Sequence, residues 1–168
     1  MLKPTHRSRA VPKALRGARF AIIASKYNAR YVEGMLQAAR AVLQAAKAAA
    51  VQEVRVPGAF EIPVVAAKLA SGSSIPFNAI ICLGVILRGQ TTHAQHIGEG
   101  VSQALAQIQV LYRVPVIHEV LLLESEDQAQ ARCLNPAHNR GAEAALTALE
   151  MAQVMAGLDQ APAARPQR

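Results

Sequence analysis

The sequence has 168 residues, of which 52% are hydrophobic and 17% charged, and this composition indicates a folded domain and excludes disorder over most of the chain. The formal net charge of +7 comes from the two ends, since residues 20–158 are neutral. A folded nucleic-acid-binding face would cluster its cations along one element, so a nucleic-acid partner is disfavoured.

The ends of the chain are expected to lie outside the domain. Residues 1–18 are basic and contain two prolines, which predicts a flexible arm, and residues 158–168 are expected to form a disordered tail. Residues 19–157 then form the domain. A solvated arm is the favoured interpretation, and binding of RNA or anionic lipid by the arm stays open.

Four short apolar runs alternate with longer helical patterns between these ends. The predicted strands are 20–24, 51–56, 79–87 and 114–123. The predicted helices are 32–49, 62–69, a helix that opens near Thr92 and includes 97–111, 127–133 and 141–156. This alternation predicts an α/β fold, a three-layer sandwich with a four-stranded parallel sheet and helices on both faces. In such sheets ligands bind beyond the carboxyl ends of the strands.

The loop after the third strand carries the densest set of polar residues. Thr92 and Gln95 fit a capping box, which would leave the N–H groups of Gln90 and Thr91 free for a phosphate. His93 follows in the first helical turn, where the positive helix end favours a neutral, proton-accepting imidazole. A surface histidine in a capped helix start is an equally good interpretation of this loop alone.

The other loops offer aromatic and charged side chains. Phe60 and Glu61 after the second strand suit a stacked planar substrate that donates a hydrogen bond, although a hydrophobic staple beside a first-turn Glu is the simpler alternative. Tyr27 after the first strand could stack on a ring or cover the sheet edge. Arg132 and Arg140, near the last helix break, could bind phosphate or be solvated.

The two cysteines and the histidines give no sign of a metal site or a disulfide framework. Cys82 and Cys133 are isolated in the sequence, and His93 and His96 are three residues apart without an obvious third ligand. We therefore expect no metal site. No stretch reaches the roughly 18 apolar residues of a membrane helix, and the basic N-terminal segment lacks the apolar region of a secretory signal. These features favour a cytoplasmic protein without a membrane partner.

Five motifs in order carry a resemblance to a known family. They are Tyr27-Asn28, Val56–Pro63, Gly84–His93, Pro115–Ile117 and Asn139–Ala145. In this order they resemble the 6,7-dimethyl-8-ribityllumazine synthase family over about residues 19–157. The resemblance implies flavodoxin-like strand order and a transferase of riboflavin biosynthesis. The family condenses 5-amino-6-(D-ribitylamino)uracil with 3,4-dihydroxy-2-butanone 4-phosphate and releases phosphate, without a cofactor.

The resemblance also assigns roles to individual positions. His93 would transfer protons, and Gln90 and Thr91 would offer backbone N–H groups to the sugar phosphate, with Arg132 and Arg140 supplying positive charge. The other substrate-binding positions are Tyr27, Asn28, Ala59, Phe60, Glu61, Val85, Ile86, Leu87 and His118. The resemblance implies a homo-oligomer, a pentamer or an assembly of pentamers, whose sites lie between neighbouring subunits.

The sequence departs from the family pattern beside these positions. His118 and Glu119 stand where the family usually has Phe and Gly, and Arg140 replaces a Lys. The arm lacks the family's usual short strand. Two other hypotheses therefore stay open, namely a weakly catalytic homologue that binds a lumazine or flavin, and a capsid-like structural assembly.

Overall fold

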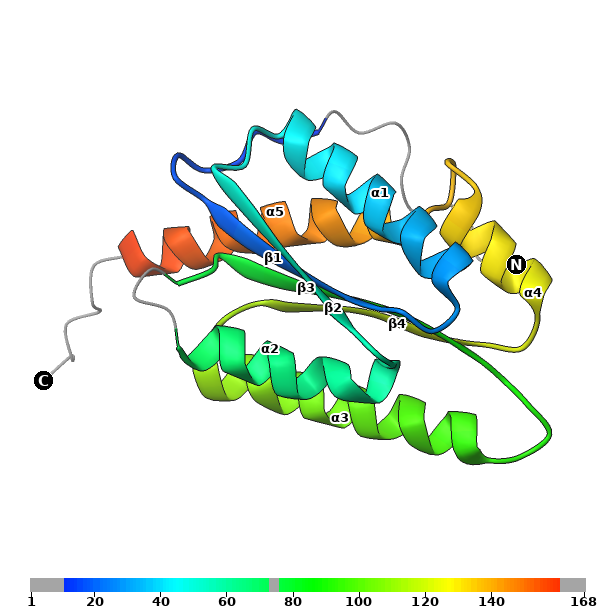
Figure 1. Ribbon diagram of the computed structural model, residues 1–168. Helices are drawn as coiled ribbons and strands as arrows, with labels where there is room; N and C mark the ends of the chain where they lie inside the picture. Colours follow the sequence, from blue (N-terminus) through cyan, green and yellow to red (C-terminus); the bar gives the residue numbers. More distant parts are fainter. Residues whose placement is uncertain (1–10, 73–75, 161–168) are drawn as a thin grey trace, which may run out of the picture.

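The core of the structure is a four-stranded parallel sheet, as the sequence predicts. The computed structural model describes residues 11–72 and 76–160, and its sheet has the strand order β2-β1-β3-β4 (Figure 1). The strands are β1 (Arg19–Ser25), β2 (Ala50–Val56), β3 (Ala79–Leu87) and β4 (Val116–Leu123). This is the predicted flavodoxin-like order, so the carboxyl ends of all four strands lie at one edge of the sheet.

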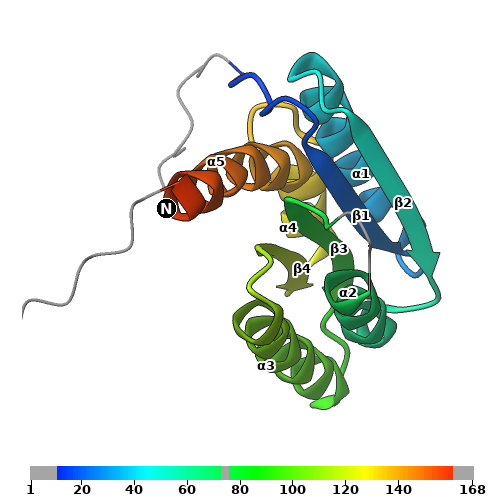
Figure 2. The ribbon, with the colours of Figure 1, turned by 90° about the vertical axis from the view of Figure 1, so that its left-hand side faces the viewer.

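Helices cover both faces of this sheet and complete the predicted three layers (Figures 1 and 2). One face carries α1 (Ala29–Ala45), α4 (Glu126–Ala129), a π-helical turn η2 (Gln130–Leu134) and α5 (Arg140–Gln160). The other face carries α2 (Ile62–Ser71), α3 (His93–Tyr112) and the short 3-10 turn η1 (Ala59–Glu61). No helix in the described part of the chain is long and apolar enough to cross a membrane.

Two apolar cores lie between the three layers, and β3 supplies both. Ile81 and Leu83 pack towards α1 and α5, whereas Ile80 and Cys82 pack towards α2 and α3. A strand buried on both faces needs apolar residues throughout, which is why β3 has no polar alternation. Because β3 is held so firmly, it fixes the position of the loop that follows it.

The helix boundaries of α1 and α5 differ from the prediction. Asn28 adopts a left-handed conformation directly before α1, so the helix begins at Ala29 rather than residue 32. The helix ends at Ala45 rather than at residue 49. Lys47, two residues later, also has a left-handed backbone (φ 60°). Helix α5 continues to Gln160, so residues 158–160 of the expected tail are helical, and 161–168 lie outside the described residues.

The described part of the expected N-terminal arm packs against the domain. The backbone N–H of Ala14 donates to the carbonyl of Ala46 over 2.8 Å, and Ala18 is only 2% exposed. Residues 11–18 are therefore held against the end of α1. The remaining part of the arm, residues 1–10, lies outside the described residues.

Candidate active site

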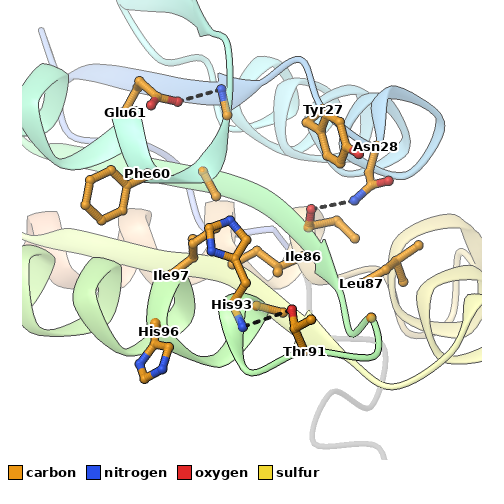
Figure 3. Close-up of a pocket in the computed structure, with 15 residues that line it drawn as sticks. Tyr27, Asn28, Phe60, Glu61, Ile86, Leu87, Thr91, His93, His96 and Ile97 are labelled. Carbon is orange, nitrogen blue, oxygen red and sulfur yellow. Dashed lines mark hydrogen bonds between the residues drawn. The ribbon is translucent and has the colours of Figure 1, made fainter.

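A cavity of about 710 Å³ opens at the carboxyl ends of β1, β2 and β3 (Figure 3). Three loops and the first turn of α3 surround it, as the parallel topology requires. Its walls are Tyr27, Asn28, Gly58, Ala59, Phe60, Glu61, Val85, Ile86, Leu87, Gly89, Thr91, His93, Ala94, His96 and Ile97. Ten of the fourteen predicted site residues are in this set. Gln90, His118, Arg132 and Arg140 are not.

The loop after β1 is tied to both neighbouring strands. The backbone N–H of Lys26 donates to Val56 over 2.8 Å, and the Asn28 side-chain amide donates to the carbonyl of Val85 over 2.8 Å. Asparagine tolerates the left-handed backbone at position 28 and spans the gap to β3 with its side chain. The Tyr27 ring stays 73% exposed beside the cavity, where it is available for stacking (Figure 3).

The loop after β2 is braced by Glu61. One carboxylate oxygen of Glu61 accepts from the backbone N–H of Gly58 over 2.8 Å, which closes the turn into η1. Phe60 is 63% exposed, so it is not the buried hydrophobic staple of the simpler interpretation. Its ring lies near Gly100 of α3, where an added Cβ would be 3.6 Å from the ring. The loop thus presents an aromatic ring and a carboxylate beside the cavity.

The loop after β3 brings His93 and Thr91 to the cavity (Figure 3). The predicted capping box is not formed, because Thr92 has a helical backbone and makes no side-chain cap, while the Gln95 amide bonds to Glu99 instead. The His93 N–H instead points to the Thr91 hydroxyl over 3.4 Å. Within residues 11–72 and 76–160, the N–H groups of Gln90 and Thr91 have no hydrogen-bond partner. They remain available to an anion at the start of a 20-residue helix.

His118 lies on β4, away from these loops. Its Nε2 is 2.9 Å from the hydroxyl of Ser102 on α3, and that hydroxyl donates to the carbonyl of Gly98 over 2.7 Å. Because the single hydroxyl proton goes to Gly98, Nε2 of His118 is the donor in this pair. The ring is exposed and presents Nδ1 as its acceptor when neutral.

Arg140 begins α5, and its backbone is fixed by a buried asparagine. The Asn139 side-chain amide donates to the carbonyl of Cys133 over 2.6 Å, while its oxygen accepts from the N–H of Gly141 over 2.9 Å. Gly141 packs so tightly on α1 that an added Cβ would lie 1.9 Å from the carbonyl oxygen of Met35. Sequence reasoning did not single out Asn139 or Gly141, although both stand inside the Asn139–Ala145 motif.

In the sequence, Glu119 stands out only as a departure from the family pattern, whereas the structure gives it a distinct chemical state. It is half-buried on β4, and burial raises the pKa of its carboxyl to about 7, with Arg140 and Arg132 opposing the shift and Glu143 adding to it. Arg140 pairs with Glu143 through Nη1. Arg132 makes no ion pair with any described residue. Two arginines and two carboxyl groups therefore share the region where β4, η2 and α5 meet.

The arrangement can hold a planar ring, an anion and a proton-transferring group. Tyr27 and Phe60 offer aromatic faces, the free N–H groups near Thr91 suit an anion, and His93 can accept a proton. Among the described residues no group of three His, Cys, Asp or Glu side chains gathers as metal ligands would.

Comparison with known proteins connects this site to one family. The model of the 6,7-dimethyl-8-ribityllumazine synthase family matches residues 17–156. Curated proteins named 6,7-dimethyl-8-ribityllumazine synthase are similar over most of the chain. The protein of Kineococcus radiotolerans is 38% identical over 148 residues, covering 87% of this chain and 90% of its own length. The proteins of Stenotrophomonas maltophilia and Xanthomonas campestris pv. campestris are 39% and 40% identical, each over 82% of this chain and 89% and 90% of theirs.

Proposed function

The chain belongs to the 6,7-dimethyl-8-ribityllumazine synthase family of transferases in riboflavin biosynthesis, and from that premise we propose how its own residues carry out the reaction. The proposed substrates are 5-amino-6-(D-ribitylamino)uracil and 3,4-dihydroxy-2-butanone 4-phosphate. An amine of the first condenses with the ketone of the second, phosphate and water leave, and ring closure gives 6,7-dimethyl-8-ribityllumazine. The observation that carries the proposal is the joint placement of His93, Thr91 and the exposed aromatic rings of Tyr27 and Phe60 around one cavity.

The pyrimidine ring is proposed to bind between the loops after β1 and β2. Tyr27 and Phe60 have exposed rings for stacking. The second carboxylate oxygen of Glu61 makes no hydrogen bond to a described residue, so it can accept from a ring N–H. Val85, Ile86 and Leu87 provide an apolar wall at the end of β3. Asn28 and Ala59 shape the floor, since Asn28 is bonded to β3 and Ala59 is 8% exposed.

The sugar phosphate is proposed to bind at the start of α3. The N–H groups of Gln90 and Thr91 would donate to phosphate oxygens, where the helix dipole favours negative charge. His93 would then accept a proton from the condensing amine and return it to a leaving oxygen. Proton transfer by His93 would add to the acceleration that comes from holding the two substrates in a reactive orientation.

The site is proposed to be completed by a second copy of the chain. His118, Arg132 and Arg140 line no part of the cavity that contains His93, yet the family resemblance places them at the same substrates. Large apolar side chains remain exposed in this single chain, including Val64 at 68% and Leu111 at 71%, as expected of a protein that buries them on assembly. We infer a homo-oligomer, and a pentamer by family resemblance. Two buried free thiols agree with the proposed cytoplasmic location.

The test is a direct assay of the purified full chain. Mixing it with both substrates should produce the lumazine chromophore well above a control without protein, which measures the uncatalysed condensation. A rate at background from an intact oligomer would overturn the synthase proposal. It would favour the second candidate, a homologue that binds the lumazine without making it, which His118 and Glu119 motivate.

A further inference from the structure

Glu119 lies on the face of β4 that packs towards α5. Ile117 and Leu123 on this strand belong to the core beneath α1 and α5, whereas Val116 and Val120 belong to the opposite core. Glu119 has the same parity as Ile117 and Leu123, so its side chain faces η2 and α5. The carboxyl is therefore on the side of the sheet covered by η2 and α5, which carry Arg132 and Arg140, while His118 next to it faces α3.

The charged surroundings of Glu119 come from two elements. Arg132 on η2 and Arg140 and Glu143 on α5 are the charged groups that act on its carboxyl in the described chain. From β3, the register places the apolar Leu83 beside it. Cys133 on η2 also interacts electrostatically with Glu119. Burial raises the pKa of this thiol to about 11, so the thiol stays neutral at physiological pH. The charge of the cluster therefore depends on one proton.

The two arginines have guanidinium groups that are not fully used within the described chain. Arg132 has no ion-pair partner among the described residues, and Arg140 engages Glu143 through Nη1, which leaves its other guanidinium nitrogens available. Glu143 neutralises one of the two cations. Glu119 is the remaining group that can neutralise the second.

We propose that Glu119 is a positioning residue that sets the charge of the Arg132–Arg140 site, so that a phosphate-like dianion binds there together with a proton on Glu119. The inference rests on the proposed function, in which these arginines bind the phosphate of the sugar substrate. With Glu119 ionised, the charges of the two arginines and the two glutamates sum to zero. The half-buried Glu119 carboxylate then repels the dianion. With Glu119 protonated, one net positive charge remains to attract it.

The size of the effect follows from the protonated fraction. Burial raises the pKa of Glu119 to about 7, so most carboxyls carry a proton at pH 6 and only about one in ten does at pH 8. A ligand that binds only the protonated form loses affinity in proportion to this fraction. The apparent affinity for a dianion should therefore fall roughly tenfold between pH 6 and pH 8.

Sulfate is the appropriate probe, because it stays a dianion throughout this range and any pH dependence belongs to the protein. Its affinity for the assembled full chain would be measured by titration calorimetry at pH 6 and pH 8, in two buffers of different ionisation enthalpy. The variants are Glu119→Gln, which keeps the shape without the charge, and Glu124→Gln as a matched control. Glu124 pairs with Arg88 over 3.0 Å and is exposed outside the cluster.

The proposal expects the wild type and Glu124→Gln to lose about tenfold in sulfate affinity at pH 8 and to take up close to one proton on binding there. Glu119→Gln should bind sulfate within about twofold at both pH values and take up none. An unchanged pH dependence in Glu119→Gln, or a pH-independent wild type, would overturn the role of Glu119. Absence of sulfate binding at pH 6, or binding unaffected by Arg132→Ala, would instead overturn the phosphate site of the proposed function.

Discussion

The residues assigned to one chemical task lie in two regions that the fold treats differently. The cavity region, lined by the loops after β1, β2 and β3 and by the start of α3, is open and gathered within one chain. The arginine region, where β4, η2 and α5 meet, contains Glu119, Arg132, Arg140 and Glu143, is closely packed and lines no part of that cavity. The difference teaches that a parallel sheet can assemble a ligand cavity within one chain, whereas the charges of the proposed phosphate site lie outside this cavity and would have to come from a second copy of the chain.

Subunit complementation is the sharpest way to test this division. His93→Ala should lower the condensation rate by at least ~100-fold, because it removes the residue that is proposed to transfer protons. Arg132→Ala should also be nearly inactive at low sugar phosphate concentration. If each site takes His93 from one chain and Arg132 from its neighbour, equal mixing by joint unfolding and refolding should restore about a quarter of wild-type activity.

The control for this experiment pairs two variants of the same region. A mixture of His93→Ala with His93→Gln should recover nothing, since no site then receives an intact histidine. If the His93→Ala and Arg132→Ala mixture stayed inactive after subunit exchange had been demonstrated by mass, the division of the site between chains would be wrong.

A pair of glycine substitutions compares how tightly the two regions pack. At Gly141, a new Cβ would lie 1.9 Å from the Met35 carbonyl oxygen, so Gly141→Ala must push α5 away from α1. We expect this to lower the free energy of unfolding by about 1–3 kcal/mol. At Gly89, beside the cavity, an added Cβ meets nothing within 4 Å, so Gly89→Ala should stay within ~0.5 kcal/mol of wild type.

Urea unfolding at a fixed protein concentration measures both glycine variants. Equal losses of stability would contradict the proposed contrast between a packed region and an open one. A loss confined to Gly141→Ala would further link the backbone of Arg140 to the contact between α1 and α5, because Asn139 bonds both Cys133 and Gly141.

The cavity region could be predicted from the sequence because its residues follow directly after strands that can be recognised from local sequence patterns. Loops that follow adjacent parallel strands meet at one edge, so Tyr27, Phe60 and His93 came together once the strands were identified. The cap at Thr92 was predicted wrongly, since a pattern of residue types does not determine that position 92 adopts a helical backbone with its hydroxyl unused.

The arginine region could be predicted only in part, because its properties depend on tertiary packing. The sequence identified Arg132 and Arg140, but the state of Glu119 depends on which face of β4 it occupies and on how far η2 and α5 bury it. The pairing of His118 with Ser102 likewise depends on the distance between β4 and α3. Neither the burial of Glu119 nor the distance between β4 and α3 can be deduced from a local sequence pattern.

The pH dependence of stability tests Glu119 without any ligand. Its pKa is raised to about 7 in the folded chain from an ordinary 4.5, so the folded state holds a proton that the unfolded state has released across this window. Stability from this group is therefore fully present below pH 4.5 and is lost as pH rises towards 7. Glu119→Gln should show a smaller fall in thermal unfolding midpoint between pH 5 and pH 8 than wild type, whereas Glu124→Gln should keep the wild-type fall. Equal falls in all three would contradict the buried state of Glu119.

The smallest expected effect concerns His118, which belongs to the β4 edge but faces α3. Ser102→Ala removes the hydroxyl that accepts from Nε2 over 2.9 Å, so the ring loses its fixed orientation while His93 is untouched. We expect a few-fold rise in KM for the ribitylaminouracil, of the order of one exposed hydrogen bond worth ~1 kcal/mol, with kcat nearly unchanged. In a His118→Phe background the same substitution should have no effect, because the hydroxyl acts only through the imidazole. An equal effect in both backgrounds would show that Ser102 supports α3 instead, through its bond to Gly98. A large loss of kcat in Ser102→Ala would indicate that His118 transfers protons instead of orienting the substrate.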